Sequence, residues 1–364
     1  MIPTQNILYI GPYREESSRG FYSYMNIKAL EKAGHKLKII PLFSYGKLNN
    51  KFSQEIEHLE ENNLDKYDVC IQHCETLDYA YNSYFKKNIG IYDFGNFDPN
   101  PMVNSNVILL DKIVVSSENK KTILQNVLSQ QLHQNIIVSP QLININHIRY
   151  KEKKELDWPD KNRFYFYSEL DFSEQYDWEK LIYIYLTSFM NKNTGLIIQT
   201  KDLEEEKIKL LKNQIYSMAT AAKVKPVSSA MPQVLNGVYD EENLLTIHNS
   251  VDCLIDVNKS NEPSYSALCF AINDKPIICN KYLTTADYFS KAYRVDGMIC
   301  NSSMIYNNDI MNSSMNNYYY TLDGEQLKNA MLETYQNRYK TKNIDIYKQE
   351  INNHDISQIN NILI

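Results

Sequence analysis

The stretch VDCLIDVNKSNEPSYSALCFAINDKPIIC at residues 251–279 decides the fold that this sequence predicts. Its first and last apolar runs are typical of buried strands, and the Ala- and Leu-containing run between them is typical of a short helix. A strand, a polar turn, a helix and a second strand in this order form a βαβ unit, whose strands pair in parallel. We therefore expect an α/β fold, with the polar turn as a ligand-binding loop.

The same alternation occupies both halves of the chain. Strand-like runs lie at residues 6–10, 37–42, 67–72, 88–92, 112–116, 136–139, 164–167, 196–200 and 224–227, and helical patterns at 178–189, 203–222 and 241–249. The charged segment 150–161 lacks an apolar stripe, which indicates a domain junction. The sequence predicts two doubly wound Rossmann-like domains facing across a cleft, at residues 1–150 and 164–340, with a linker at 151–163.

The composition is that of an ordinary globular protein. The chain has 364 residues, of which 43% are hydrophobic and 23% charged, and its net charge of -6 gives no general attraction to nucleic acid or anionic lipid. The six cysteines lie mostly in apolar runs and lack zinc-site spacing. We find no signal peptide and no membrane span, and we expect a cytoplasmic protein.

The loop GPYREESSRG at residues 11–20 follows the first predicted strand. Gly11 and Gly20 allow close backbone approach, and Arg14 can bind a phosphate or carboxylate bidentately. The loop matches neither the dinucleotide-binding fingerprint nor a P-loop. A glycine turn that only precedes a helix would have the same sequence, so both interpretations stay open.

His73, Asp93 and Thr200 lie at the carboxyl ends of further predicted strands, where doubly wound sheets bind ligands. A histidine there can donate a hydrogen bond or a proton, and an aspartate can accept from hydroxyl groups. A single histidine at a strand end is also common as a structural residue. No Ser-His-Asp order or metal-ligand cluster accompanies these residues, so no metal is predicted.

The polar turn at residues 258–266 is longer than a connection needs, and Pro263 suits the first turn of the helix that follows. Glu262 is suited to accept hydrogen bonds from sugar hydroxyls, although an ordinary carboxylate at a helix start would look the same. The N–H groups that could hold a diphosphate are those of Ser264, Tyr265 and Ser266.

With its preceding helix, this stretch, EENLLTIHNSVDCLIDVNKSNEPSYSALCFAINDKPII, resembles the donor-binding motif of retaining, family-4-type glycosyltransferases of the GT-B fold. Other segments are similar to that family in order: GPYREESSRGFYSYMNIKALEKAGHKLKIIPL, LDKIVVSSENKKTIL, and YRVDGMICNSS followed by YTLDGEQLKNAMLETYQN. The resemblance implies a two-domain enzyme that transfers a sugar from a UDP- or GDP-linked donor to an acceptor, without a metal or other cofactor. It also implies that residues 341–364 cross back to the first domain, although residues 344–364 are too polar for a core element.

The resemblance assigns roles to the candidate residues. Glu262 matches the first glutamate of the family's Glu-x7-Glu motif and would contact the transferred sugar. The amides of residues 264–266 match the loop at the diphosphate, and the loop at 11–20 would complete the donor site. His73 and Asp93 would line the sugar and acceptor side.

Two departures from the family's pattern concern the donor site. Cys269 stands where the family has its second glutamate, the usual ribose ligand. The family's Arg and Lys after the first strand of the second domain are absent from SELDFSEQYDW at residues 168–178, so Lys259 or Arg14 would have to neutralise the diphosphate. Two alternatives therefore remain, a catalytically inactive GT-B protein that binds a glycan, nucleotide or protein partner, and an unrelated two-domain α/β binding protein.

Overall fold

The computed structural model describes residues 3–15, 18–42, 50–74, 79–92, 107–150, 156, 160, 162–173, 176–200, 203–224, 231–237, 239–259, 261, 264–301, 318–338 and 346–362. Within these ranges no helix is both long enough and apolar enough to cross a membrane. The chain folds into two compact units. Unit 1 comprises Met1–Ile145, Asn261–Ser264 and Gln349–Ile364, and unit 2 comprises Asn146–Ser260 and Tyr265–Lys348. Most of the predicted linker and residues 339–345 lie outside the described ranges, so the predicted domain boundaries stay predictions.

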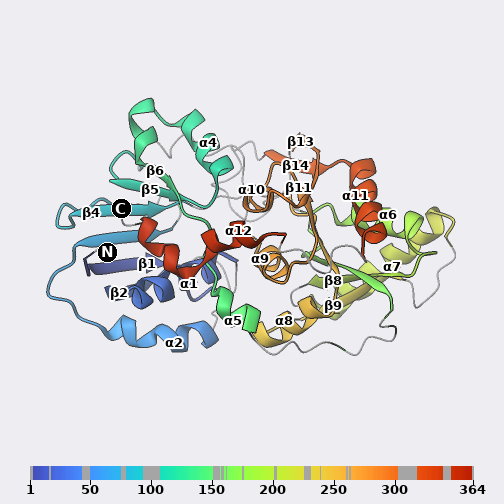
Figure 1. The fold of residues 1–364 in the computed structure, drawn as a ribbon, viewed down its shortest axis with the longest axis horizontal. Coiled ribbons are helices and arrows are strands. Elements are labelled where there is room, and N and C mark those ends of the chain that lie inside the picture. Colours follow the sequence, from blue (N-terminus) through green and yellow to red (C-terminus); the bar gives the residue numbers. More distant parts are fainter. Residues whose placement is uncertain are drawn as a thin grey trace. The chain divides into compact units, whose positions relative to one another are not determined.

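Unit 1 contains a six-stranded parallel sheet. Its strands are β1 (Asn6–Gly11), β2 (Lys36–Pro41), β3 (Val69–His73), β4 (Lys87–Ile91), β5 (Lys112–Val115) and β6 (Ile136–Val138), and each overlaps a predicted strand. They lie in the order β2-β1-β3-β4-β5-β6, and Figure 1 labels β2 and β1 at one side of the sheet and β4, β5 and β6 at the other. The winding direction changes between β1 and β3, which makes this pair the topological switch point of unit 1.

The core of unit 1 includes residues from late in the sequence. The helical elements of this unit include α1 (Ser18–Lys32), α2 (Asn50–Glu61), α4 (Glu118–Val127) and the 3₁₀ segment η4 (Ile356–Ile362), which packs on α1. Shorter ones are η2 (Gln130–Asn135), α12 (Lys348–Ile351) and η3 (Asn352–His354). Ile356, Ile359 and Ile362 are buried in the same core as Ile7 and Leu30. The expectation that residues 344–364 are too polar for a core element is therefore wrong, because a 3₁₀ helix has three residues per turn and places every third residue on one side.

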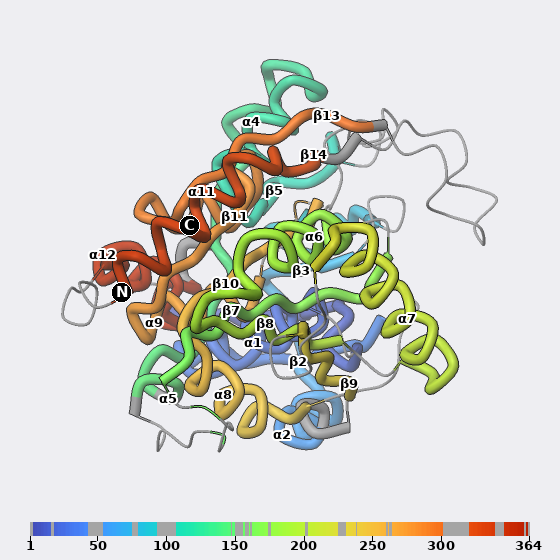
Figure 2. The backbone as a smooth tube through the Cα atoms, turned by 90° about the vertical axis from the view of Figure 1, so that its right-hand side faces the viewer, coloured from blue at the N-terminus to red at the C-terminus, as the bar shows by residue number. Residues whose placement is uncertain are grey.

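Unit 2 contains a second six-stranded parallel sheet. Its strands are β7 (Phe164–Glu169), β8 (Thr194–Thr200), β9 (Gln233–Asn236), β10 (Cys253–Asp256), β11 (Ile277–Asn280) and β12 (Tyr293–Val295). They lie in the order β12-β11-β10-β7-β8-β9, and Figure 2 shows β10, β7 and β8 side by side. The switch point of unit 2 lies between β7 and β10. Together the two sheets confirm the predicted α/β class with two doubly wound domains.

Most helices of unit 2 agree with the predicted patterns. The helices α6 (Trp178–Ser188), α7 (Glu205–Ala221), α8 (Glu241–Asn249) and α9 (Tyr265–Ile272) match predicted helical patterns. The patterns did not mark α5 (Ile145–Tyr150), α10 (Thr284–Tyr288) and α11 (Gly324–Gln336). A small antiparallel pair is formed by β13 (Gly297–Asn301) and β14 (Tyr318–Leu322). Val224 follows the turn at the end of α7, and residues 225–227 lie outside the described ranges. The edge strand that pairs with β8 on the side away from β7 is β9, which the sequence patterns did not predict.

Candidate functional site

The switch point of unit 2 brings together the ends of β7 and β10 and the start of α9. Glu169 ends β7, Asp256 ends β10, and α9 begins at Tyr265 directly after the polar turn. Carboxyl ends of parallel strands at a switch point are where doubly wound sheets bind ligands. The residues at the ends of β7 and β10 and at the start of α9 are therefore the candidate site of unit 2.

A chain of hydrogen bonds joins α8, α9 and β7 at this point. The Ser266 hydroxyl donates to Glu169 Oε2 at 2.6 Å and lies 3.2 Å from His248 Nε2. Burial lowers the pKa of His248 to about 3, so its ring is neutral at physiological pH. Because Ser266 gives its single hydrogen to the carboxylate, His248 Nε2–H must donate to the Ser266 oxygen. The chain fixes the Glu169 carboxylate over the first turn of α9.

Asp256 places a second carboxyl group beside Glu169. The Thr285 hydroxyl donates to its Oδ2 at 2.8 Å, and the Asn258 backbone N–H donates to its Oδ1 at 3.2 Å. Burial raises the pKa of Asp256 above its usual value, and the charge of Glu169 acts in the same direction. The switch point of unit 2 is therefore acidic.

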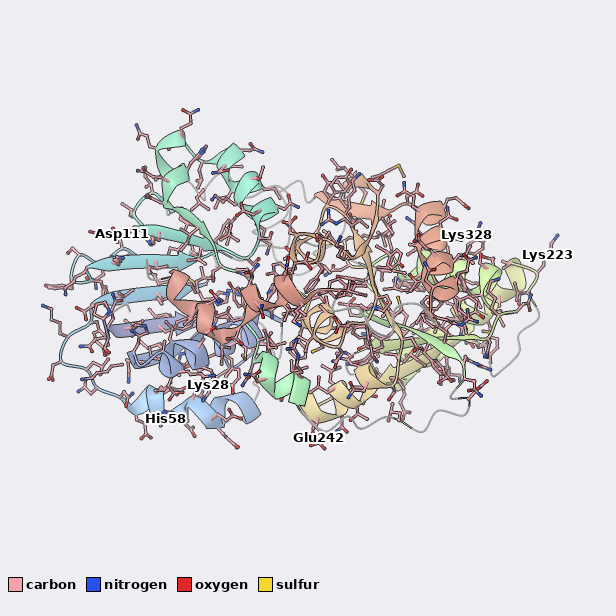
Figure 3. All side chains as sticks on the ribbon, viewed as in Figure 1. Lys28, His58, Asp111, Lys223, Glu242 and Lys328 are labelled. Carbon is pink, nitrogen blue, oxygen red and sulfur yellow. The ribbon has the colours of Figure 1, made fainter. Side chains whose placement is uncertain are left out.

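Cys269 and Tyr265 lie on α9 next to a third carboxylate. The Tyr265 hydroxyl donates to Oε1 of Glu241, which lies in the first turn of α8, at 3.3 Å. Cys269 is fully buried, and burial raises the pKa of its thiol, so the side chain is a neutral thiol. The next residue along α8, Glu242, points outward into solvent (Figure 3).

Lys259 pairs with a carboxylate of unit 2. Its ammonium lies 3.5 Å from Oδ1 of the buried Asp177, which also accepts from the Leu322 N–H at 2.6 Å and the Thr321 hydroxyl at 2.8 Å. Asp177 thus connects the segment before α6 with β14, and Lys259 helps to balance its charge. Lys259, which the sequence suggested as a phosphate-binding cation, is thus paired with the carboxylate of Asp177.

Arg14 is paired in the same way within unit 1. Its Nε and Nη2 donate to the two carboxylate oxygens of Glu60 on α2, at 2.9 and 2.6 Å, and the Tyr13 hydroxyl donates to Glu60 Oε1 at 2.8 Å. A bidentate Arg–carboxylate pair uses the planar fork that a phosphate would otherwise use. The sequence did not predict this pair, because the two residues are far apart in the chain.

Gly11 and Gly20 are explained by packing. A Cβ on Gly11 would lie 2.7 Å from Ser23 Oγ, and a Cβ on Gly20 would lie 2.2 Å from the Glu15 carbonyl oxygen. Either contact is closer than a carbon atom tolerates, so the absent side chains let α1 approach its own entry loop and β1. Packing therefore accounts for both glycines, and their predicted part in donor binding stays a prediction.

His73 ends β3 at the switch point of unit 1, where its side chain is fully buried. The Tyr9 hydroxyl lies 3.2 Å from its Nδ1. The ring of Tyr22 on α1 meets the imidazole edge-on, with 5.3 Å between ring centres. His73 is therefore held by a tyrosine from the neighbouring strand and one from the covering helix.

The remaining predicted residues lie apart or outside the described ranges. Thr200 ends β8 and is buried, but the Tyr167 hydroxyl donates to Gln199 on the Glu169 side of the sheet, so Thr200 points to the opposite side. Ser264 is half-buried directly before α9. The predicted catalytic residues Glu262 and Asp93 lie outside the described residues.

Sequence patterns alone did not select His248 and Asp256 for the site. Asp256 ends an apolar strand, which is the criterion that selected His73 and could have selected it too. His248 follows Leu244 and Leu245 at the spacing of an apolar helix face, so its burial was a detectable signal.

No protein-family model matches the chain, and no curated protein sequence matches it. Solved structures, in contrast, match it over its whole length. HepE from Anabaena in complex with UDP is 11% identical with a TM-score of 0.64, and the match covers 98% of each chain. A UDP-forming trehalose-phosphate synthase from Burkholderia xenovorans is 8% identical with a TM-score of 0.61, covering 99% of this chain and 98% of that chain.

A sucrose-phosphate synthase from Thermosynechococcus elongatus is also similar, at 11% identity and a TM-score of 0.61 over 98% of this chain and 96% of that chain. At such low identity these likenesses show the fold. They extend over both units.

Proposed function

The chain has the GT-B fold, and we propose that it is a glycosyltransferase that moves a sugar from a nucleotide diphosphate sugar to an acceptor. The observation that supports this proposal is the whole-length likeness to proteins solved with UDP and with UDP-2-fluoroglucose. The acidic cluster at the β7–β10 switch point adds support, because carboxylates accept hydrogen bonds from sugar hydroxyls.

In the proposed reaction, the bond between sugar C1 and the diphosphate oxygen breaks, and the acceptor oxygen bonds to C1 on the same face. The acceptor's proton passes to the departing diphosphate, so the reaction needs neither a protein nucleophile nor a bound metal. Glu262 would contact the transferred sugar, and the N–H groups at the start of α9 would hold the diphosphate. The protein would act by orientation and charge stabilisation.

A second function is favoured by the charges around α9. Glu169 and Asp256 are acidic, while Lys259 is paired with Asp177. Within unit 1, Arg14, the other predicted phosphate cation, is paired with Glu60. A diphosphate bound at the start of α9 would face carboxylates where compensating cations are expected. The alternative proposal is therefore a catalytically inactive GT-B protein that binds a glycan, nucleotide or protein partner.

Calorimetric titration with UDP and GDP, followed by an assay of nucleotide release from the corresponding sugar nucleotides, separates the two functions. The glycosyltransferase proposal predicts binding of one nucleotide at millimolar concentration or below, with slow nucleotide release. Glu262→Gln should retain nucleotide binding and lose turnover. No binding of either nucleotide would contradict the enzyme and favour the alternative, and unchanged turnover in Glu262→Gln would contradict the role of Glu262.

A further inference from the structure

Glu241 is turned from α8 towards the start of α9. It is the first residue of α8, and its Oε1 accepts a hydrogen bond of 3.3 Å from the phenol of Tyr265, the first residue of α9. Glu241 and Tyr265 are both half-buried, whereas the next residue, Glu242, is exposed and points into solvent (Figure 3). Tyr265 therefore holds one carboxylate of α8 next to the first turn of α9.

A carboxylate in this position is suited to bind two neighbouring hydroxyl groups, because it offers two acceptor oxygens and carries no hydrogen of its own. The other groups nearby are less suitable. Cys269, one turn further along α9, is fully buried, and a neutral thiol is only a weak acceptor. Asp256 already accepts a hydrogen bond at each of its oxygens, from the Thr285 hydroxyl and from a backbone N–H. Among these three groups, Glu241 is therefore the best acceptor for a ligand diol.

The nucleotide of the proposed donor carries such a diol in its ribose. When the diphosphate binds the N–H groups in the first turn of α9, the ribose lies only a few bonds away from that turn. The Tyr265 side chain spans a similar separation, between its own backbone in that turn and the Glu241 carboxylate. We infer that Glu241 accepts hydrogen bonds from the ribose 2′- and 3′-hydroxyl groups of the donor, with Tyr265 as its positioning residue. Carboxylates bind ribose hydroxyls in this way in other doubly wound folds, and the inference rests on the proposed function.

Calorimetric titration of the full-length protein with UDP and with 2′,3′-dideoxy-UDP, and with the corresponding pair of guanosine nucleotides, tests the inference. The wild type should bind the ribonucleotide about ten- to a hundredfold more tightly, as hydrogen bonds to a charged group predict. In Glu241→Gln this ratio of Kd values should fall to about threefold or less, because the carboxamide has one acceptor oxygen, which Tyr265 can still use. The repulsion between the Glu241 charge and the diphosphate is the same for both nucleotides, so it cancels in the ratio.

Glu242→Gln is the matched control, because it removes the same charge from the next, exposed residue, and it should keep the wild-type ratio. Tyr265→Phe should give a ratio between those of the wild type and Glu241→Gln, because the carboxylate stays but is no longer held in place. A wild-type ratio in Tyr265→Phe would overturn the positioning role. Nucleotide binding with equal ratios in the wild type and Glu241→Gln would overturn the inference and leave the proposed function standing. No binding of UDP or GDP would overturn both.

Discussion

Replacing Glu169 by glutamine should tighten the binding of UDP. The Glu169 carboxylate accepts a hydrogen bond of 2.6 Å from the Ser266 hydroxyl in the first turn of α9. A diphosphate bound to the N–H groups of the same turn would lie roughly 5–6 Å from this carboxylate, given a rise of about 1.5 Å per helical residue. The glutamine oxygen can still accept from Ser266, so the change removes the charge and retains the hydrogen bond.

The expected gain follows from the Coulomb repulsion that is removed. One phosphate charge and one carboxylate about 6 Å apart repel by roughly 1.5–3 kcal/mol at an effective dielectric constant of about 20–40. This corresponds to a decrease of about ten- to a hundredfold in Kd. Calorimetric titration with UDP at low ionic strength measures this Kd. The difference in Kd between Glu169→Gln and the wild type should become smaller as salt is added.

Glu242→Gln is the control, because it removes the same charge from an exposed position on α8 (Figure 3). Its Kd for UDP should stay within about twofold of the wild type. Equal affinities of the Glu169 and Glu242 variants would refute the reasoning that Glu169 repels the diphosphate. Weaker binding in Glu169→Gln would show instead that the carboxylate accepts hydrogen bonds from the ligand.

Two further predictions concern His248 and Lys259. Burial lowers the pKa of His248 from 6.5 to about 3. Between these two pH values the ring is protonated in the unfolded chain but not in the folded protein, so the free energy of unfolding should decrease as the pH falls from 6.5 towards 3. Within this range His248 should lower the free energy of unfolding by about 1.4 kcal/mol for each pH unit. In urea unfolding, the free energy should therefore fall less steeply with decreasing pH in His248→Gln than in the wild type or in the exposed control His58→Gln. Equal dependence on pH in the three proteins would contradict the prediction. Lys259→Met should lower the free energy of unfolding by roughly 1–3 kcal/mol, because it leaves Asp177 less compensated. Its Kd for UDP should stay within about threefold, as in the control Lys328→Met on α11 (Figure 3), and a tenfold loss would show that Lys259 binds the nucleotide.

The fold was largely predictable because its signals are local. Apolar runs bounded by polar turns marked most strands, and the helical spacing of residues 241–249 matches α8. The exceptions have physical reasons. Strand β9 is half-buried throughout, so it lacks a continuous apolar run, and η4 follows a period of three that a search for α-helical spacing overlooks.

The candidate site was less predictable because its contacts join distant residues. Arg14 was a good phosphate ligand by residue type, yet Glu60 lies 46 residues away and takes both of its donor positions. Ser266 and Glu169 are 97 residues apart, so the sequence around either residue does not indicate that they form a hydrogen bond. Residue type and strand order indicate where a site lies, while the pairing of charges within it depends on the tertiary structure.

The late isoleucines of η4 have a consequence for biosynthesis. Unit 2 is built almost entirely from residues 146–348, whereas unit 1 also needs residues 349–364. A chain emerging from the ribosome can therefore complete the second core while the first still lacks Ile356, Ile359 and Ile362. The part of the protein that is made first therefore cannot complete its apolar core until the last residues have been made.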